Sequence, residues 1–163
     1  MLNNLHICTA NVKGLRDKQK RLRLYQWIKN QKCKIFFIQE THFNTSLENA
    51  LTIESDHSYY SHGTTSSRGV AILINNKLDY KLIDEHKDLE GRIIMINIEF
   101  ENIIYSLINI YAPNIESERN SFYKKLNDFL NKNAIGTIIL GGDMNDALKN
   151  VDRKSSNILK KAS

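Results

Sequence analysis

The sequence predicts an α/β fold in which a meander of strands lies between two units that each combine a strand with a helix. One unit opens the chain and the other follows the meander, and each pairs an apolar run with apolar residues at helical spacing. Between them, short runs of β-branched and aromatic residues are separated by Gly, Asn and Asp turn signals. We therefore expect a mixed sheet rather than a purely parallel one.

The first unit is a predicted strand–helix–strand segment. Residues 5–12 alternate in side-chain direction, as in a strand, and the spacing of apolar residues predicts a helix over 17–31. The run over 34–40 is continuously apolar at its centre, as expected of a strand that is buried on both faces. The helix face expected to be buried contains Leu24, Trp27 and Ile28.

The meander begins after a weak short helix or loop over 45–53. A polar hairpin loop is expected over 63–69, with turns at Asn75-Asn76 and Glu101-Asn102. Strands are expected over 57–61, 70–74, 80–84, 92–99 and 103–111.

The second unit follows the only proline of the chain. Ser117 is expected to cap a helix, and a short buried strand over 135–140 is expected to end in a tight turn that contains Asp143 and Asn145. The buried stripe of the helix is expected to contain Phe122, Leu126, Phe129 and Leu130.

The length and composition are typical of a soluble globular protein. A chain of 163 residues, 41% hydrophobic and 25% charged, has the size and balance of one soluble globular domain. It has no apolar run of the roughly 18 residues that a membrane span needs, and no signal peptide is recognised. Cys8 and Cys33 are expected to be reduced, which would fit an intracellular protein. The net charge of +5 favours a polyanionic partner without requiring one.

Polar side chains follow four of the predicted strands at the point where each strand ends: Asn11, Glu40, Tyr111, and Asp143 with Asn145. Each has an ordinary interpretation as a turn residue, a cap or a packed tyrosine. Because ligands gather at the carboxyl ends of strands in α/β folds, their joint occurrence favours a shared site.

The chemistry of these groups is that of phosphate hydrolysis. Glu40, with help from Asp143, would hold Mg²⁺, whose charge polarises a phosphoryl oxygen and stabilises the leaving group. Asn11, Tyr111 and Asn145 would position the phosphate and the nucleophile through hydrogen bonds, and Asp143 could instead orient the attacking water.

Six short motifs follow one another along the chain: Asn11-Val12-Lys13-Gly14-Leu15, Gln39-Glu40-Thr41-His42, Gly69-Val70-Ala71-Ile72-Leu73, Asn109-Ile110-Tyr111-Ala112-Pro113-Asn114, Gly142-Asp143-Met144-Asn145 and Asp152-Arg153. They occur in the order seen in the endonuclease/exonuclease/phosphatase superfamily. The sequence resembles in particular the apurinic-like endonuclease domain of non-LTR (long-interspersed-type) retrotransposons.

The resemblance implies a four-layered α/β sandwich and Mg²⁺-dependent cleavage of phosphodiester bonds in DNA, with Mn²⁺ as an alternative cation. The active-site set carried over by position is Asn11, Glu40, Tyr111, Asp143 and Asn145, with Glu40 and Asp143 as metal ligands. Lys13, Asn114 and Arg153 would face the DNA. An intracellular location is implied, in the nucleus if genomic DNA is the substrate, with the reverse transcriptase region of a parent open reading frame as a further partner.

The sequence departs from the family pattern at two places. Lys13 stands where relatives usually have Asp or Asn, so it would either weaken Mg²⁺ binding by repulsion or reach a phosphate. The family also has a terminal Ser-Asp-His segment, whose histidine stabilises the transition state, and residues 155–163 contain no Asp and no His.

We therefore expect residues 1–163 to be a single, C-terminally incomplete domain that contains the N-terminal two-thirds of the sandwich and is weak or inactive as an enzyme. The apolar face of Ile94, Ile96 and Ile98, or its reverse, is expected to have less to pack against. Two alternatives stay open: a non-catalytic basic remnant that binds nucleic acid, and a phosphatase that acts on a small phosphoester.

Overall fold

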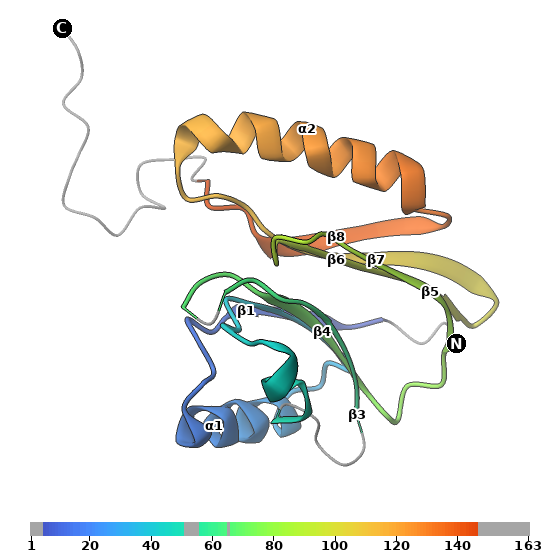
Figure 1. The fold of residues 1–163 in the computed structure, drawn as a ribbon. Helices are drawn as coiled ribbons and strands as arrows, with labels where there is room; N and C mark the ends of the chain where they lie inside the picture. Colours follow the sequence, from blue (N-terminus) through green and yellow to red (C-terminus); the bar gives the residue numbers. More distant parts are fainter. Residues whose placement is uncertain (1–4, 51–55, 65, 147–163) are drawn as a thin grey trace, which may run out of the picture.

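The computed structural model describes residues 5–50, 56–64 and 66–146, and these form four layers. Figure 1 shows helix α1 (Lys18–Lys29) under a first sheet, a second sheet stacked above it, and helix α2 (Glu116–Asn133) on the outer face of the second sheet. The expected four-layered sandwich is confirmed. The expected mixture of parallel and antiparallel pairing is confirmed, but the strands divide into two sheets of four rather than forming one.

The first sheet has the strand order β1-β2-β4-β3. Strand β1 (Ile7–Asn11) pairs in parallel with β2 (Ile35–Gln39), as a connection through a helix requires. Strands β4 (Val70–Asn75) and β3 (Asp56–Ser61) continue the sheet as an antiparallel hairpin. Every residue of β2 is buried, as its continuous apolar run predicted. The weak segment before the meander is a short 3₁₀ helix over Thr45–Ala50.

The second sheet has the order β5-β6-β7-β8. Its first three strands, β5 (Lys81–Lys87), β6 (Ile93–Phe100) and β7 (Ile103–Tyr111), form an antiparallel meander. The β6–β7 turn places Glu101 and Asn102 at φ values of 51° and 61°, as expected of a tight two-residue hairpin turn. Helix α2 then returns the chain to β8 (Thr137–Asp143), which pairs in parallel with β7.

The main core lies between the two sheets. The expectation that the face of Ile94, Ile96 and Ile98, or its reverse, has less to pack against is wrong, since all three side chains are fully buried against the first sheet. The reverse face of β6 is covered by α2, which packs on Ile93 and Met95. The fully buried inter-sheet residues on the first sheet include Ile35, Ile72 and Ile74.

The helices follow the predicted apolar stripes with two corrections. Leu24 and Ile28 of α1 are buried, whereas Trp27 remains 37% exposed and contacts Phe36 through its ring edge. Helix α2 begins at Glu116, so Ser117 lies inside its first turn and does not cap it; the N-cap position is Ile115, which makes no side-chain cap bond.

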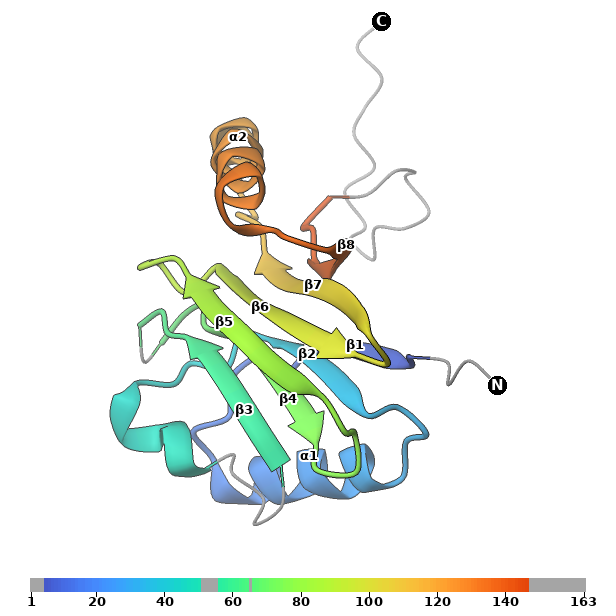
Figure 2. The same cartoon turned by 90° about the vertical axis from the view of Figure 1, so that its right-hand side faces the viewer.

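Strand β8 lies at a margin of the second sheet, beside β7 (Figure 2). The expectation of a buried strand is wrong here, because Ile138 and Leu140 are 50% and 37% exposed. The strand also continues through Gly141 and Gly142, which were expected to lie in a turn, and ends at Asp143. No helix of the described residues is long and apolar enough to cross a lipid bilayer.

The expectation that the two cysteines are reduced is wrong. Cys8 on β1 and Cys33 just before β2 form a disulfide, with their Cα atoms 6.1 Å apart, within the range that a disulfide requires. The two residues come together because β1 and β2 are neighbours in the sheet. The cysteines therefore give no support to an intracellular location.

Candidate active site

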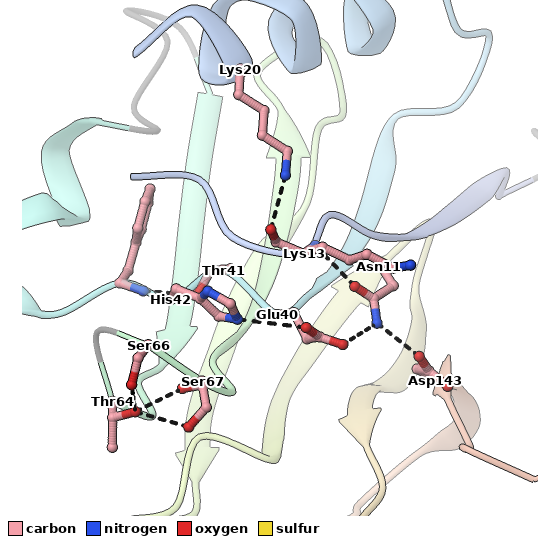
Figure 3. A network of polar contacts seen from close by, with 11 residues as sticks. Asn11, Lys13, Lys20, Glu40, Thr41, His42, Thr64, Ser66, Ser67 and Asp143 are labelled. Carbon is pink, nitrogen blue, oxygen red and sulfur yellow. Dashed lines mark hydrogen bonds and ion pairs between the residues drawn. The ribbon is translucent and has the colours of Figure 1, made fainter. Parts of the chain in front are cut away.

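The carboxyl ends of β1, β2, β7 and β8 meet at one edge of the sandwich and bring together the predicted site residues. The side-chain amide of Asn11 lies at their centre: its Nδ2 donates to Glu40 Oε1 at 2.7 Å and to Asp143 Oδ2 at 2.8 Å (Figure 3). Glu40 follows β2 of the first sheet, and Asp143 ends β8 of the second. Asn11 is therefore a direct link between the two sheets at this edge.

Glu40 is held in an unusual backbone conformation. Its φ is 55°, in the left-handed region that non-glycine residues rarely adopt. The segment is fixed from both sides, because Gly14 N donates to Glu40 O at 2.6 Å and Thr41 N donates to Gly69 O at 3.1 Å. The Glu40 side chain is 21% exposed, so its carboxylate faces the mouth of the site rather than the core.

Strained backbone gathers at this edge of the sheets. Of the seven described non-glycine residues with positive φ, two form the β6–β7 turn and the other five surround the site. Such conformations cost of the order of 1–3 kcal/mol each and persist only where the surrounding structure holds them, which is typical of functional sites. The five are Lys13, Glu40, His42, Arg68 and Asn145.

Tyr111 ends β7 and faces the carboxylates. Burial, followed by the hydrogen bond and negative charge of Glu40, raises the pKa of the Tyr111 phenol, while the Asn145 side chain acts in the opposite direction. The phenol is thus protonated at neutral pH and available as a hydrogen-bond donor. Arg92 holds this residue from the other side: its Nη1 donates to Tyr111 O at 3.1 Å, and its guanidinium lies 5.4 Å from the ring centroid.

Asp143 and Asn145 lie in a tight turn, as expected. Asp143 is the last residue of β8, and Asn145 lies beyond the end of the strand with a φ of 48°. Its backbone N donates to Asp143 Oδ1 at 2.9 Å, which closes a tight turn, and its Nδ2 donates to Ala112 O at 2.6 Å. Both oxygens of Asp143 therefore accept hydrogen bonds, one from Asn145 and one from Asn11.

Two of the three residues expected to face DNA lie in the described part of the chain. Lys13 is exposed and lies beside Asn11 (Figure 3); its backbone N donates to Asn11 Oδ1 and its carbonyl accepts from Lys20 Nζ. Asn114 is exposed before α2, and its carbonyl accepts from Arg119. Arg153 lies outside the described residues.

Two contacts of the site were missed by the sequence reasoning. Arg92 was not singled out, although it immediately follows Gly91 at the entry of a buried strand. His42 was not counted among the site residues, and the structure places its Nε2 3.5 Å from Glu40 Oε2. Neither contact has a local signal, because the contact to Tyr111 spans 19 residues and that to Glu40 depends on the two left-handed residues of this loop.

The donor set fits a hard divalent cation. Glu40 Oε1 and Asp143 Oδ2 share the donor Asn11 Nδ2, so they lie no more than about 5.5 Å apart. Mg²⁺ is usually held by one or two carboxylates together with water and substrate phosphate, which is the set available here. Within the described part of the chain no cluster of three or more His, Cys, Asp or Glu side chains is arranged for a metal, so a cage made entirely of protein ligands is not formed there.

Comparison with known proteins gives the family of this chain and several relatives. The family model described as Endonuclease/Exonuclease/phosphatase family matches residues 8–163. The chain is 26% identical over 159 residues to the transposon TX1 uncharacterized 149 kDa protein of Xenopus laevis, covering 96% of this chain and 12% of that protein. It is 27% identical over 162 residues to an exodeoxyribonuclease of Bacillus subtilis, covering 93% of this chain and 62% of the enzyme.

Solved structures share the fold. An AP endonuclease from Leishmania major superposes with a TM-score of 0.71 at 19% identity, covering 91% of this chain and 57% of that structure. An AP endonuclease from Archaeoglobus fulgidus gives a TM-score of 0.68 at 22% identity, covering 91% of this chain and 60% of that structure. This chain thus spans less than two-thirds of the length of each of these relatives. With its sandwich of two sheets and a family match over nearly its whole length, the chain belongs to the endonuclease/exonuclease/phosphatase family.

Proposed function

We propose that this protein hydrolyses phosphodiester bonds in DNA with the help of Mg²⁺ or, as an alternative, Mn²⁺. The observation that carries the proposal is the link that Asn11 makes between Glu40 and Asp143, which gathers two carboxylates from different sheets beside the Tyr111 phenol. Two carboxylates repel one another at short range, so their close placement at this edge favours a cation that both could bind.

Each residue has a defined task in this proposal. Tyr111 donates from a phenol that stays protonated at neutral pH and so can bind a phosphate oxygen. Asp143 is an acceptor whose two oxygens are oriented by Asn11 and Asn145, which suits it to align the attacking water. Asn11 orients both carboxylates, and Asn145 fixes the turn after β8 against Ala112 O.

Glu40 and Asp143 are the residues that would hold the cation. When bound, Mg²⁺ would supply Lewis-acid polarisation of a phosphoryl oxygen and stabilisation of the leaving group. The exposed Lys13 beside Asn11 places a positive charge near these carboxylates, so Lys13 is proposed to contact a backbone phosphate.

DNA is proposed as the substrate on three grounds: the net charge of +5, the family, and the names of the relatives, which include an exodeoxyribonuclease and AP endonucleases. Similarity to a transposon protein supports the further proposal that the chain derives from a retrotransposon open reading frame, with the reverse transcriptase region as a partner and the nucleus as the place of action.

We further propose that hydrolysis by this chain is slow. The family resemblance implies a histidine that stabilises the transition state from the far side of the phosphate. Of the described histidines, only His42 lies at the site, and its Nε2 is directed at Glu40. His57 contacts Tyr80 and His86 contacts Asp84, while His62 stacks on Tyr60 at the end of β3, which β4 separates from β2.

Nicking of supercoiled plasmid DNA in the presence of Mg²⁺ tests the proposal, with wild type compared with Glu40→Ala and Asp143→Ala. Glu85→Ala is the matched control, since it removes a carboxylate on β5, away from the site. We expect weak nicking that is lost in both site variants and retained in the control. Salt-sensitive DNA binding without nicking would instead support a nucleic-acid-binding protein, and turnover of a soluble phosphoester with duplex DNA untouched would support a phosphatase.

A further inference from the structure

Two amide side chains join the sheets directly beneath the candidate site. Gln39 and Asn109 are 1% and 0% exposed, and Gln39 Nε2 donates to Asn109 Oδ1 at 2.7 Å. Gln39 belongs to β2 of the first sheet and Asn109 to β7 of the second. We propose that this pair, the inter-sheet clasp, consists of positioning residues that set the relative placement of the two halves of the site.

The clasp is tied to three strands of the first sheet, β1, β2 and β4. Asn109 Nδ2 donates to Ile38 O at 2.9 Å and to Ala71 O at 2.7 Å, so one side chain of the second sheet binds two neighbouring strands of the first. Gln39 Nε2 also donates to Thr9 Oγ1 at 3.0 Å on β1. Hydrogen bonds have directional requirements that apolar contacts lack, so these bonds specify one alignment of the sheets.

The clasp lies between the apolar core and the site. Deeper in the sandwich, Phe37 of the first sheet and Leu107 of the second belong to the apolar core between the sheets. On the other side of the clasp, Tyr111 lies two residues after Asn109 on the same face of β7, and Glu40 is the next residue after Gln39. An error in sheet alignment at the clasp is therefore transmitted directly to Tyr111 and Glu40.

Strand β8 is held close at the same level. Gly141 pairs with Asn109 in the sheet, and a Cβ added to Gly141 would meet the Phe37 ring at 3.0 Å. The absence of a side chain there allows β8 to approach the first sheet and brings Asp143, two residues on, to the Asn11 amide. The clasp and this close approach together explain how one Asn11 amide can reach carboxylates on both sheets.

The proposal rests on the proposed function for its meaning in catalysis, but it can be tested without activity. The variants are Gln39→Met and Asn109→Leu, which keep size and remove the polar groups. Gln39→Met leaves the two carbonyl bonds of Asn109 in place, so it covers the case in which Asn109→Leu fails to fold. The matched control is Asn97→Leu: Asn97 is also fully buried in the second sheet, but its amide donates to Asp84 and to Asn133 O, away from the site.

The readout is hydrogen exchange of the Asn11 side-chain amide by NMR, with β6 backbone amides as the check that each variant is folded. We expect exchange at least about tenfold faster in both clasp variants, and unchanged exchange in Asn97→Leu, because an opening of the site of the order of 1 Å breaks the Asn11 link. Unchanged exchange in the folded clasp variants, or equal acceleration in the control, would overturn the proposal. A wild-type Asn11 amide that exchanges like an exposed one would also overturn it.

Mn²⁺ binding, followed by electron paramagnetic resonance, separates this proposal from the proposed function. We expect the clasp variants to bind Mn²⁺ at least about tenfold more weakly than wild type and Asn97→Leu, in parallel with the Asn11 exchange. If wild type neither binds Mn²⁺ nor nicks DNA, the proposed function fails, and the Asn11 exchange alone still decides whether the clasp positions the site.

Discussion

Replacement of Asn11 by alanine leaves two carboxylates facing each other without their shared donor. Glu40 Oε1 and Asp143 Oδ2 are at most about 5.5 Å apart, because they accept from the same nitrogen at 2.7 and 2.8 Å. At that separation two unit charges repel by about 3 kcal/mol at an effective dielectric constant of 20 and by about 0.8 kcal/mol at that of water. Since both carboxylates are partly exposed, we expect Asn11→Ala to destabilise the fold by roughly 1–3 kcal/mol in the absence of divalent cations.

Magnesium tests whether Asn11 positions the two carboxylates for a cation. The variant also loses the bond from Lys13 N to Asn11 Oδ1, worth about 1 kcal/mol, and that loss does not depend on a cation. Because Asn11 orients both carboxylates, the variant should bind Mg²⁺ more weakly, so millimolar Mg²⁺ should add less stability to Asn11→Ala than to wild type. Urea denaturation with and without MgCl₂ measures the difference.

The control for this experiment is Asn133→Ala, which removes a side-chain amide that donates to Phe129 O rather than to a carboxylate. Its stability should respond to Mg²⁺ as wild type does. Equal stabilisation of Asn11→Ala and wild type by Mg²⁺ would show that Asn11 does not position the carboxylates for a cation. An Asn11→Ala variant as stable as wild type without the cation would show that the shared donor does not stabilise the fold.

Three further predictions concern the fold. Reduction of the Cys8–Cys33 disulfide, which spans 25 residues, should destabilise the chain by about 3 kcal/mol, and a thiol titration of the native oxidised protein should find no free cysteine. Gly142→Ala should destabilise by roughly 2–4 kcal/mol in urea denaturation, because φ is 132° and the new Cβ would collide with Ile110 O; wild-type stability would contradict this backbone conformation. Burial and the Tyr59 hydroxyl raise the pKa of Tyr80. The stability that this shift contributes is therefore complete below about pH 10 and is lost as the pH rises through the higher pKa of the folded state. Tyr80→Phe should reduce this loss of stability at alkaline pH, and a pH profile of stability identical to that of wild type would contradict the raised pKa.

The sequence predicted the positions of those site residues that lie at the ends of strands. Asn11, Glu40 and Tyr111 each come at or just after the end of an apolar run, and parallel strands bring their carboxyl ends to one edge. Local pattern was enough for these residues because the relevant information, alternation and strand length, lies within a few positions.

The division into two sheets could not be predicted in the same way. The Asn75-Asn76 turn was interpreted as a connection within one sheet, whereas β4 lies in the first sheet and β5 in the second. A turn signal reports that the chain reverses, not which strand the next one pairs with. The expectation that Ile96 and its neighbours have less to pack against, which followed from the incomplete domain, is wrong because the second sheet of this chain packs on the first.

Contacts between distant segments account for the remaining misses. The Cys8–Cys33 disulfide depends on the pairing of β1 with β2, and a count of two cysteines carries no information about that pairing. The miss at Ser117 is local instead. Ser117 has the side chain of a good N-cap, but α2 begins at Glu116, so Ser117 already lies inside the helix and Ile115 occupies the N-cap position. The contact of Arg92 with Tyr111 spans two strands.

Glu40 and Asp143, brought from different sheets by the fold, are proposed to form one divalent-cation site. Titration of the protein with Mn²⁺, followed by electron paramagnetic resonance, measures binding at this site. We predict one Mn²⁺ bound per chain, lost in both Glu40→Gln and Asp143→Asn and retained in Asp84→Asn, which removes a carboxylate on β5. Binding that survives both site substitutions, or that is lost equally in Asp84→Asn, would rule out a cation site at Glu40 and Asp143.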